Sequence, residues 1–249
     1  MGGVAGLSAL AAAAETPPRK TRFYRVDYLH LRQGSQATRI TEFLGSQLPL
    51  FVRNTQAFGV FTALVAPQLP TMVVLSGFSS LEEMEAADTR LRDHSEHQAA
   101  LEKMEHGAEP PYDHAERVLL RATDFSPEIV APAEKPKKPR VFELRVYHSP
   151  TERQLRGLRE RFAGPEIQIF HRNGIHPVLY ADTVVGPQIP NLTYLTPFAG
   201  LAERERAWDA FAADPEWAKA RDESIMKGGQ IVAQSNIMLL RPTPFSPMQ

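Results

Sequence analysis

The chain has 249 residues, of which 43% are hydrophobic and 23% charged, with a formal net charge of −1. These values are typical of a globular protein long enough for two domains, and without a basic stripe they argue against nucleic-acid binding. The sequence has no cysteine, which excludes disulfides, thiolate nucleophiles and cysteine metal sites.

The N-terminal residues 1–20 read MGGVAGLSALAAAAETPPRK. The apolar run from Gly2 to Ala14 is too short for a bilayer, which needs about 20 residues, so no integral membrane segment is predicted. The run is typical of a secretory signal with a small-residue cleavage site, although no basic residue precedes Arg19. We therefore expect a signal-like or disordered N-terminus, whose start is a truncated signal peptide, on a periplasmic or secreted protein. A cytoplasmic protein with an alanine-rich tail is the alternative.

Short motifs occur twice in the chain at one spacing. APQLP at Ala66–Pro70 recurs 120 residues later (187 − 67) as GPQIP at Gly186–Pro190; RATDFSP at Arg121–Pro127 recurs as RPTPFSP at Arg241–Pro247; and Arg25-Val26 recurs as Arg145-Val146. One such echo is ordinary turn composition, but several at one offset indicate an internal duplication.

A proline- and lysine-rich stretch over residues 127–139 separates the two copies. Its composition favours an extended, solvated linker. The first repeat is therefore expected over residues 21–126 and the second over residues 140–247.

The second copy begins with VFELRVYH at Val141–His148, whose alternation and β-branched residues predict a strand. Thr151 can cap the helix that follows, with Leu155, Leu158 and Phe162 as its apolar stripe. Two strands, over residues 175–185 and 191–196, flank the GPQIP turn. A helical region opens near residue 200 and begins again at Asp214-Pro215, a capping pair. A strand over residues 230–240 ends the copy.

The order β-α-β-β-α-β, present twice, predicts an α+β fold of two tandem ferredoxin-like repeats. Each sheet has helices on one face only, so its other face needs a cover. We expect the two sheets to bury each other's open face as an intramolecular dimeric α/β barrel.

Several segments of the second copy resemble the NIPSNAP family of the dimeric α/β-barrel superfold: FELRVY at 142–147, FHRNG at 170–174, LAERERAW at 201–208 and DPEW at 214–217. The first copy departs from the pattern, with His94–His97 in place of DPEW and Asp88 in place of Trp208. The resemblance implies a ligand-binding or scaffolding domain without an agreed reaction. The same superfold includes haem-binding enzymes and cofactor-free monooxygenases, so the fold alone does not choose a function.

The two faces of the strand at Val141–His148 differ in polarity. We expect Phe142, Leu144 and Val146 to meet the helices, which directs Glu143, Arg145 and Tyr147 into the barrel. In the first copy the same inward face carries Phe23, Arg25 and Asp27. Two hypotheses remain open: these charges pair internally, or Arg25 and Arg145 together bind a carboxylate or other anion.

Tyr180 and Tyr194 are predicted to form an aromatic wall of the same pocket. His148 and His176 lie at strand ends near the expected barrel mouth, and Tyr28 occupies the position that matches His148 in the first copy. His148 could be a haem ligand or general base, with a plain surface role as the alternative.

Histidines His94, His97 and His106 raise the idea of a metal site, but the second copy has Trp217 where the first has His97. We predict a packing or surface role for them, no metal and no cofactor. Trp208, Phe211 and Trp217 have core-like helical spacing. Nucleotide loops, serine-nucleophile elbows and zinc-protease motifs do not occur in the sequence.

The sequence thus predicts a NIPSNAP protein that binds a small anionic or aromatic ligand between its repeats. The predicted ligand-binding residues are Arg25, Glu143, Arg145, Tyr147, His148, Tyr180 and Tyr194. A monooxygenase-like or haem-handling enzyme and a non-catalytic interaction module are the alternatives, so catalysis stays open. A homo-oligomer is compatible with either.

Overall fold

The computed structural model describes residues 20–107 and 109–249. The signal-like segment expected over residues 1–20 lies almost wholly outside the described residues, so export stays a prediction. Within the described ranges, no helix combines the length and the apolar character needed to cross a membrane.

Each half of the chain has the same order of elements. The first half contains β1 (Phe23–His30), α1 (Gln36–Ser46), α2 (Leu48–Arg53), β2 (Ala57–Val65), β3 (Thr71–Phe78), α3 (Leu81–Arg92), α4 (Ser95–Glu105) and β4 (His114–Ala122). The second half contains β5 (Val141–His148), α5 (Glu152–Arg161), the π-helical turn η1 (Phe162–Glu166), α6 (Ile167–Arg172), β6 (Leu179–Val185), β7 (Asn191–Phe198), α7 (Leu201–Ala213), α8 (Pro215–Gly228) and β8 (Gln234–Pro242).

The helix starts in the second half follow from capping residues. The Thr151 hydroxyl accepts from the Gln154 amide at the start of α5, and the Asp214 carboxylate accepts from the Glu216 and Trp217 amides at the start of α8. Both caps were predicted from sequence. Strand β6 is shorter than predicted because Pro177 has no amide hydrogen to donate to a sheet.

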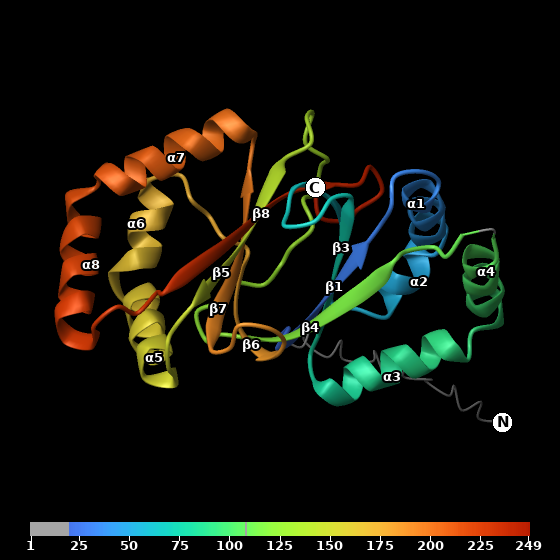
Figure 1. Ribbon diagram of the computed structural model, residues 1–249, viewed down its shortest axis with the longest axis horizontal. Helices are drawn as coiled ribbons and strands as arrows, with labels where there is room; N and C mark the ends of the chain where they lie inside the picture. The colour runs from blue at the N-terminus through green and yellow to red at the C-terminus, as the bar shows by residue number, and fades with distance from the viewer. Residues whose placement is uncertain (1–19, 108) are drawn as a thin grey trace, which may run out of the picture.

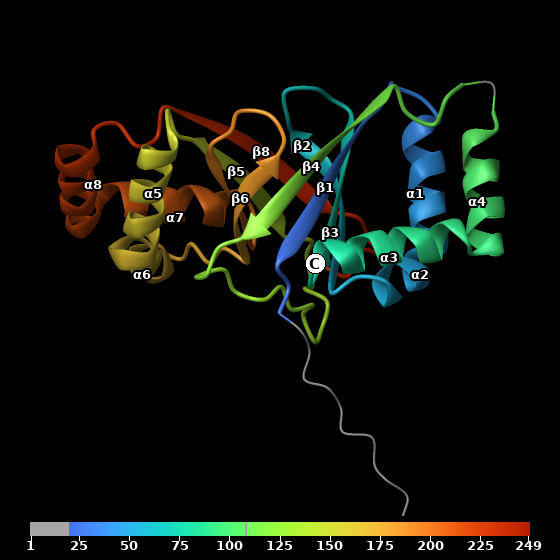
Figure 2. The same cartoon turned by 90° about the horizontal axis from the view of Figure 1, so that it is seen from below.

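The eight strands close into one barrel in the order β1-β3-β2-β8-β5-β7-β6-β4, and neighbouring strands are antiparallel. The halves meet where β2 pairs with β8 and where β4 pairs with β6. Helices α1–α4 and α5–α8 lie on opposite outer sides of the barrel, as Figures 1 and 2 show. The protein is therefore an α+β barrel with helices outside.

The first strands of the two halves align differently from the sequence repeat. Phe23 of β1 is opposite Phe78, and Val141 of β5 is opposite Phe198, so the partners are 120 residues apart (198 − 78) while the first strands are 118 apart (141 − 23). Arg25 therefore corresponds to Glu143, and the alignment of Arg25 with Arg145 is wrong. A shift of two residues keeps every side chain on its face, so alternation alone does not reveal it.

The barrel interior is packed with apolar side chains from all eight strands. They are Tyr24, Val26, Ala57, Phe61, Val73, Leu75, Val118, Leu120, Phe142, Leu144, Leu179, Ala181, Leu195 and Leu240, joined by Met248. Two further clusters lie outside the barrel, one beneath the helices of each half. Both faces of most strands are thus buried.

The repeated Phe-Ser-Pro segments tie each half to the other. After β4, the Thr123 amide donates to the Tyr180 carbonyl at 3.0 Å, and the Tyr180 amide donates to the Ser126 hydroxyl at 3.1 Å. After β8, the Thr243 amide donates to the Val60 carbonyl at 2.9 Å, and the Val60 amide donates to the Ser246 hydroxyl at 3.0 Å. The segment after β4 thus binds β6 of the second half, and the segment after β8 binds β2 of the first half. We call these two segments the clasps.

Candidate functional site

A cavity of about 320 Å³ opens at one end of the barrel, between the two halves. Its apolar wall is Val26, Val118, Leu120, Leu144, Val146, Ile237 and Met238, and its polar residues include Tyr28, His30, Thr71, Glu116, Thr183, Asn191, Thr193 and Asn236. The opposite end of the interior is filled by packed aromatic side chains such as Phe61 and Phe142, with ring centroids 5.1 Å apart. The barrel is therefore a blind pocket with one mouth.

The two repeated proline loops form part of this mouth. Ala66, Pro67 and Gln68 of one loop and Pro187 and Gln188 of the other line the cavity. Both loops contain a cis proline, Pro70 and Pro190. Placing the same loop on each side of the cavity accounts for the occurrence of the motif in both halves.

Polar contacts hold the loops against the ends of the strands. The Thr71 hydroxyl donates to the Gln68 carbonyl at 2.8 Å, and Asn191 Nδ2 donates to the Gln188 carbonyl at 3.0 Å. His148 Nδ1 lies 2.8 Å from the same Gln188 carbonyl. His148 therefore contacts a loop that lines the mouth, and its role as a site residue stays a prediction.

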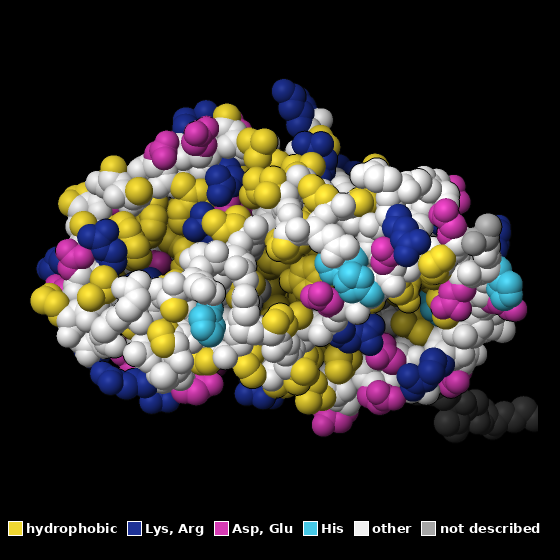
Figure 3. Space-filling model, in the orientation of Figure 1, with side chains coloured by type: hydrophobic (Ala, Val, Ile, Leu, Met, Phe, Trp, Pro, Cys, Tyr) yellow, Lys and Arg dark blue, Asp and Glu magenta, His cyan; other side chains and the backbone are white. Residues whose placement is uncertain are grey.

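A compact group of polar side chains lies on the first-half rim of the mouth. His30 Nε2 is 3.6 Å from Glu116 Oε1, and the rings of His30 and His114 stack with centroids 4.4 Å apart. Tyr28 is the residue opposite Glu116 in the sheet. Figure 3 shows histidine beside acidic side chains near a recess lined with hydrophobic groups. We call His30, His114 and Glu116 the rim cluster.

Burial sets the protonation of the rim. It lowers the pKa of His30, with His114 adding to the decrease and Glu116 opposing it. Burial also raises the pKa of Tyr28, and the nearby Glu116 carboxylate raises it further. Both pKa shifts favour the uncharged form, of the His30 imidazole and of the Tyr28 phenol, at neutral pH.

The predicted inward residues of β5 lie outside the barrel, which corrects the expected face. Phe142 and Leu144 belong to the interior core, whereas Tyr147 packs with Tyr194 and Phe162 beneath the helices. An eight-stranded barrel has an interior just wide enough for side chains or one small ligand, and in β5 the apolar face lies on that side. The polar face turns toward the helices, where ionic partners are available.

Glu143 and Arg145 form an ionic cluster with helix α7 rather than an open anion site. The Glu143 carboxylate accepts from Arg145 Nε and from Arg204 Nε and is completely buried. The Arg145 guanidinium also stacks on Trp208, 3.6 Å from the ring centre. Of the two hypotheses from the sequence, the contacts of Glu143 and Arg145 therefore favour internal ion pairing over anion binding.

Arg25 is paired in the same way in the first half. Its Nη1 donates to both carboxylate oxygens of Asp88 in α3 at 2.8 Å, and its Nε lies 3.5 Å from Asp27. Arg25 and Arg145 lie on opposite outer sides of the barrel, so the structure does not bring them together around one anion. Tyr180 and Tyr194 likewise belong to the helix-covered cluster and not to the cavity wall.

Comparison with known proteins identifies the second half. Residues 142–247 match the NIPSNAP family. The second half of the chain is a NIPSNAP domain. A NIPSNAP-like domain protein from Burkholderia xenovorans has 24% identity and a TM-score of 0.37, and the match covers 43% of this chain and 89% of that protein. A search of curated protein sequences gives no match.

Solved structures that cover almost the whole chain share its fold. A monooxygenase-like protein from Lactobacillus acidophilus has a TM-score of 0.55 at 9% identity, covering 90% of this chain and 94% of that one. An anthrone oxidase-like protein has a TM-score of 0.54 at 10% identity, covering 90% and 92%. At such low identity these matches show the two-halved barrel fold alone.

The remaining histidines of the sequence prediction do not gather around one point. His176 precedes β6 at the filled end of the barrel and stacks on His171 of the NIPSNAP domain, so its predicted place at the mouth is wrong. His97 packs against Phe43 and Phe51 with its Nδ1 3.0 Å from Gln47 Oε1. His94 caps helix α4, as its Nδ1 accepts from the His97 amide.

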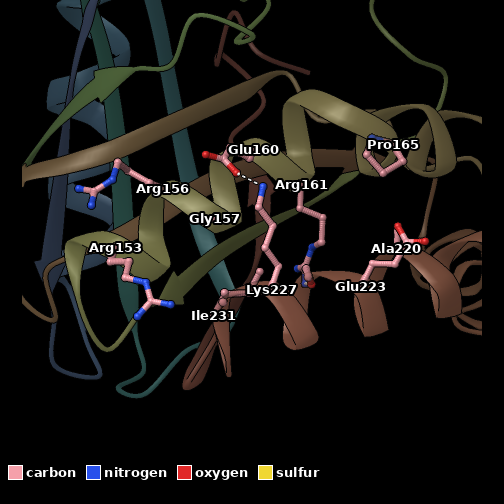
Figure 4. A pocket seen from close by; sticks show the side chains of 12 residues that line it. Arg153, Arg156, Gly157, Glu160, Arg161, Pro165, Ala220, Glu223, Lys227 and Ile231 are labelled. Atoms are coloured by element: carbon pink, nitrogen blue, oxygen red, sulfur yellow. Dashed lines mark hydrogen bonds and ion pairs between the residues drawn. The ribbon is translucent and has the colours of Figure 1, made fainter.

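A second hollow lies between α5 and α8 of the NIPSNAP domain (Figure 4). Four basic residues line it, and two of them have ionic partners: Lys227 pairs with Glu160 at 3.1 Å, and Arg161 pairs with Glu166 at 2.7 Å. The groove therefore offers less to an anion than its basic residues suggest.

Sequence reasoning missed the rim cluster because it compared Tyr28 with His148. The structure instead makes His30 the counterpart of His148, since both strands end at these residues and both are followed by a bond to a loop proline carbonyl. The alternating pair His114 and Glu116 on the last strand of the first half was the available signal. Both residues share a face that the apolar pattern of Val118 and Leu120 marks as inward.

Proposed function

We propose that the chain is a tandem pair of ferredoxin-like units whose shared barrel binds a small, mainly apolar ligand, such as an aromatic compound with one polar group. The first unit would span residues 21–126 and the NIPSNAP unit residues 140–247. The observation that carries the proposal is the cavity itself: it opens at one end of the barrel, and much of its wall is apolar, with the charged Glu116 and the imidazole of His30 at the rim.

The charge of the lining favours a neutral ligand over an anionic one. Among the described residues that line the cavity, none is Lys or Arg, and the rim carries Glu116. Arg25 and Arg145 already have ionic partners outside the barrel. An aromatic ring would pack against Val26, Leu144 and their neighbours while a hydroxyl or carbonyl meets the polar rim.

A neutral fluorescent probe, N-phenyl-1-naphthylamine, tests this function. Its emission should rise on titration with the full chain because the cavity removes it from water. Val146→Phe fills the cavity and should weaken binding by at least about tenfold, a loss of about 1.4 kcal/mol. Val130→Phe, in the exposed linker, is the matched control and should leave binding unchanged.

Equal affinities of the two variants would contradict the proposal, as would a probe that does not bind the wild type. The latter result would favour the interaction module, in which the barrel only supports surface loops. Met238→Trp is a second cavity-filling variant, used if Val146→Phe fails to fold by circular dichroism. Native mass spectrometry of the same samples reports whether two chains associate, which stays a prediction.

A second candidate function is oxidation of the bound aromatic by dioxygen. One observation favours it: a neutral imidazole, His30, lies on the rim of an apolar cavity beside Glu116, where it could act as a base on an activated C–H group. Anthrone is a suitable probe, because anthrone and O₂ give anthraquinone and water, with one oxygen atom in each product. Oxygen uptake that exceeds the uncatalysed rate and falls in His30→Ala, but not in His148→Ala, is the expected result. Uptake at the uncatalysed rate would sink this function and leave ligand binding intact.

A further inference from the structure

The rim cluster is built from one cross-strand pair and its neighbour. His30 of β1 is directly opposite His114 of β4, and Glu116 lies two residues further along β4. Residues two apart on a strand share a face, so all three side chains project from the same face as Val118 and Leu120, toward the barrel interior. The sheet therefore fixes their relative position at the mouth of the cavity.

The donor atoms of the rim cluster are close enough to share one ion. A ligating atom from each of His30, His114 and Glu116 lies within 4.8 Å of the others. Two imidazole nitrogens and a carboxylate oxygen are common ligands of divalent transition metals, at bond lengths of about 2.0 to 2.2 Å. Ligands around such an ion are about 3.3 Å apart, so small rotations of the two exposed side chains would complete the geometry.

The hydrogen bond between His30 and Thr71 indicates which ring nitrogen of His30 carries the proton. The Thr71 hydroxyl gives its hydrogen to the Gln68 carbonyl, so its oxygen accepts from His30 Nδ1, 3.1 Å away. In the neutral ring, Nε2 then carries a lone pair. Nε2 is buried and has no hydrogen-bond partner among the described residues, although it lies 3.6 Å from the Glu116 carboxylate.

In this tautomer the Nε2 lone pair and the Glu116 carboxylate, 3.6 Å apart, are two electron-pair donors that face each other. Such an arrangement is unfavourable by itself but suits a cation between the two groups. Thr71 meanwhile orients the ring through its other nitrogen, as outer-sphere partners of metal-ligating histidines do. This unpartnered nitrogen is independent of the clustering of the three residues.

We propose that His30, His114 and Glu116 bind one divalent transition-metal ion, zinc or a similar metal, with open coordination positions directed into the barrel cavity. Three protein ligands with an open position are typical of reactive rather than structural zinc sites. The open position would place a Lewis acid where the polar group of a cavity ligand is expected. The metal site does not rest on the proposed aromatic ligand, because its donors are all side chains of the first half.

The equivalent place in the second half lacks two of the three proposed metal ligands. His148 corresponds to His30, but the positions of His114 and Glu116 are occupied by Gln234 and Asn236 (234 − 114 and 236 − 116 are both 120). Asn236 Nδ2 donates to the Gln188 side chain instead. Amides lack the charge and basicity of the first-half donors, so one metal per chain is expected.

Isothermal titration of the metal-free full chain with zinc chloride, on protein purified without a polyhistidine tag, tests the site. Wild type should bind one zinc ion. His30→Ala and Glu116→Gln should each weaken binding by at least about a hundredfold, whereas His148→Ala should match wild type. Glu116 is 56% exposed, so Glu116→Gln is expected to fold normally and gives a result even if His30→Ala does not.

Cobalt and a transplanted site sharpen the test. Cobalt bound by the wild type should give visible absorption bands typical of a four- or five-coordinate ion, and Glu116→Gln should lose them. Gln234→His combined with Asn236→Glu should raise the stoichiometry from one zinc to two. Absence of zinc binding by the wild type, or binding that Glu116→Gln leaves unchanged, would overturn the proposal. Neither result would bear on binding of the neutral fluorescent probe.

Discussion

The first strands of the two halves carry ion pairs of opposite polarity at equivalent positions. In β1 the helix-facing pair is Arg25 followed by Asp27, whereas in β5 it is Glu143 followed by Arg145. The helices compensate: Asp88 of α3 meets Arg25, and Arg204 of α7 meets Glu143. What the two halves share is therefore a neutralised cluster between strand and helix, and not any particular charged residue.

The two clusters differ most in their exposure to water. Glu143 is completely buried and has two arginine partners, while Asp88 retains 25% of its side-chain exposure. Arg145 is further covered by the ring of Trp208, at the position where the first half has Asp88. A buried charge that loses its partner costs more than an exposed one, so the halves should respond unequally to equivalent substitutions.

The largest effect is expected from removing the buried acid. Glu143→Gln leaves Arg145 and Arg204 without a carboxylate and should lower the free energy of unfolding by about 3 to 5 kcal/mol. Asp88→Asn in the first half should cost about 1 kcal/mol, because water can solvate Arg25 in its place. Urea denaturation of both variants measures the difference. Equal losses would show that burial does not separate the two clusters.

The next effect is a pH dependence that arises from a buried acid of the NIPSNAP domain. Burial raises the pKa of Glu166 from 4.5 to about 7, while its partner Arg161 acts in the opposite direction. A folded-state pKa above the unfolded one gives stability that is fully present below pH 4.5 and is lost as the pH rises to about 7. Over that window the wild type should lose about 3 kcal/mol relative to Glu166→Gln.

In the first half, the position that corresponds to Glu166 is occupied by Gln47, a neutral residue between α1 and α2. Gln47 contacts His97 of α4. Chemical denaturation of the full chain at several pH values therefore reports mainly on Glu166 once the Glu166→Gln curve is subtracted. Glu160→Gln, at an exposed site paired with Lys227, is the control and should keep the wild-type slope. A wild-type slope that survives in Glu166→Gln would refute the assignment.

The smallest effect concerns the caps of the last helix in each half. Asp214 accepts from two backbone amides and forms a two-point ion pair with Arg172, while His94 accepts from one amide at 3.3 Å. Hydrogen bonds from Arg172 and Asn173 also lower the pKa of Asp214. Asp214→Ala should lower Tm by more than His94→Ala does, as thermal unfolding would show. A larger loss in His94→Ala would reverse the ranking.

The sequence predicted the elements well because its local signals are strong. Thr151 and Asp214 are good caps, and the proline turns separate strands at both sites. Alternation also showed which residues of β5 share a face. It did not show which face lies inside, because both faces of β5 are buried and only the neighbouring elements distinguish them.

The candidate site was harder to predict because it depends on pairing between strands. His30 and His114 are far apart in the chain and meet only through the register of β1 with β4. A two-residue shift of β1 relative to the sequence repeat hid the correspondence of His30 with His148. Side-chain period and motif spacing do not contain that information.

The exchanged clasps and the paired edges also bear on how the chain is made. During synthesis the first half emerges with β2 and β4 as open edges. The Val60 amide of β2 cannot form its hydrogen bond until Ser246, 186 residues away, has been synthesised. Open edges can pair with any similar strand, including those of another nascent chain. The short linker counters this by keeping the correct partner at a high effective concentration, which makes the covalent fusion itself a safeguard against misassembly.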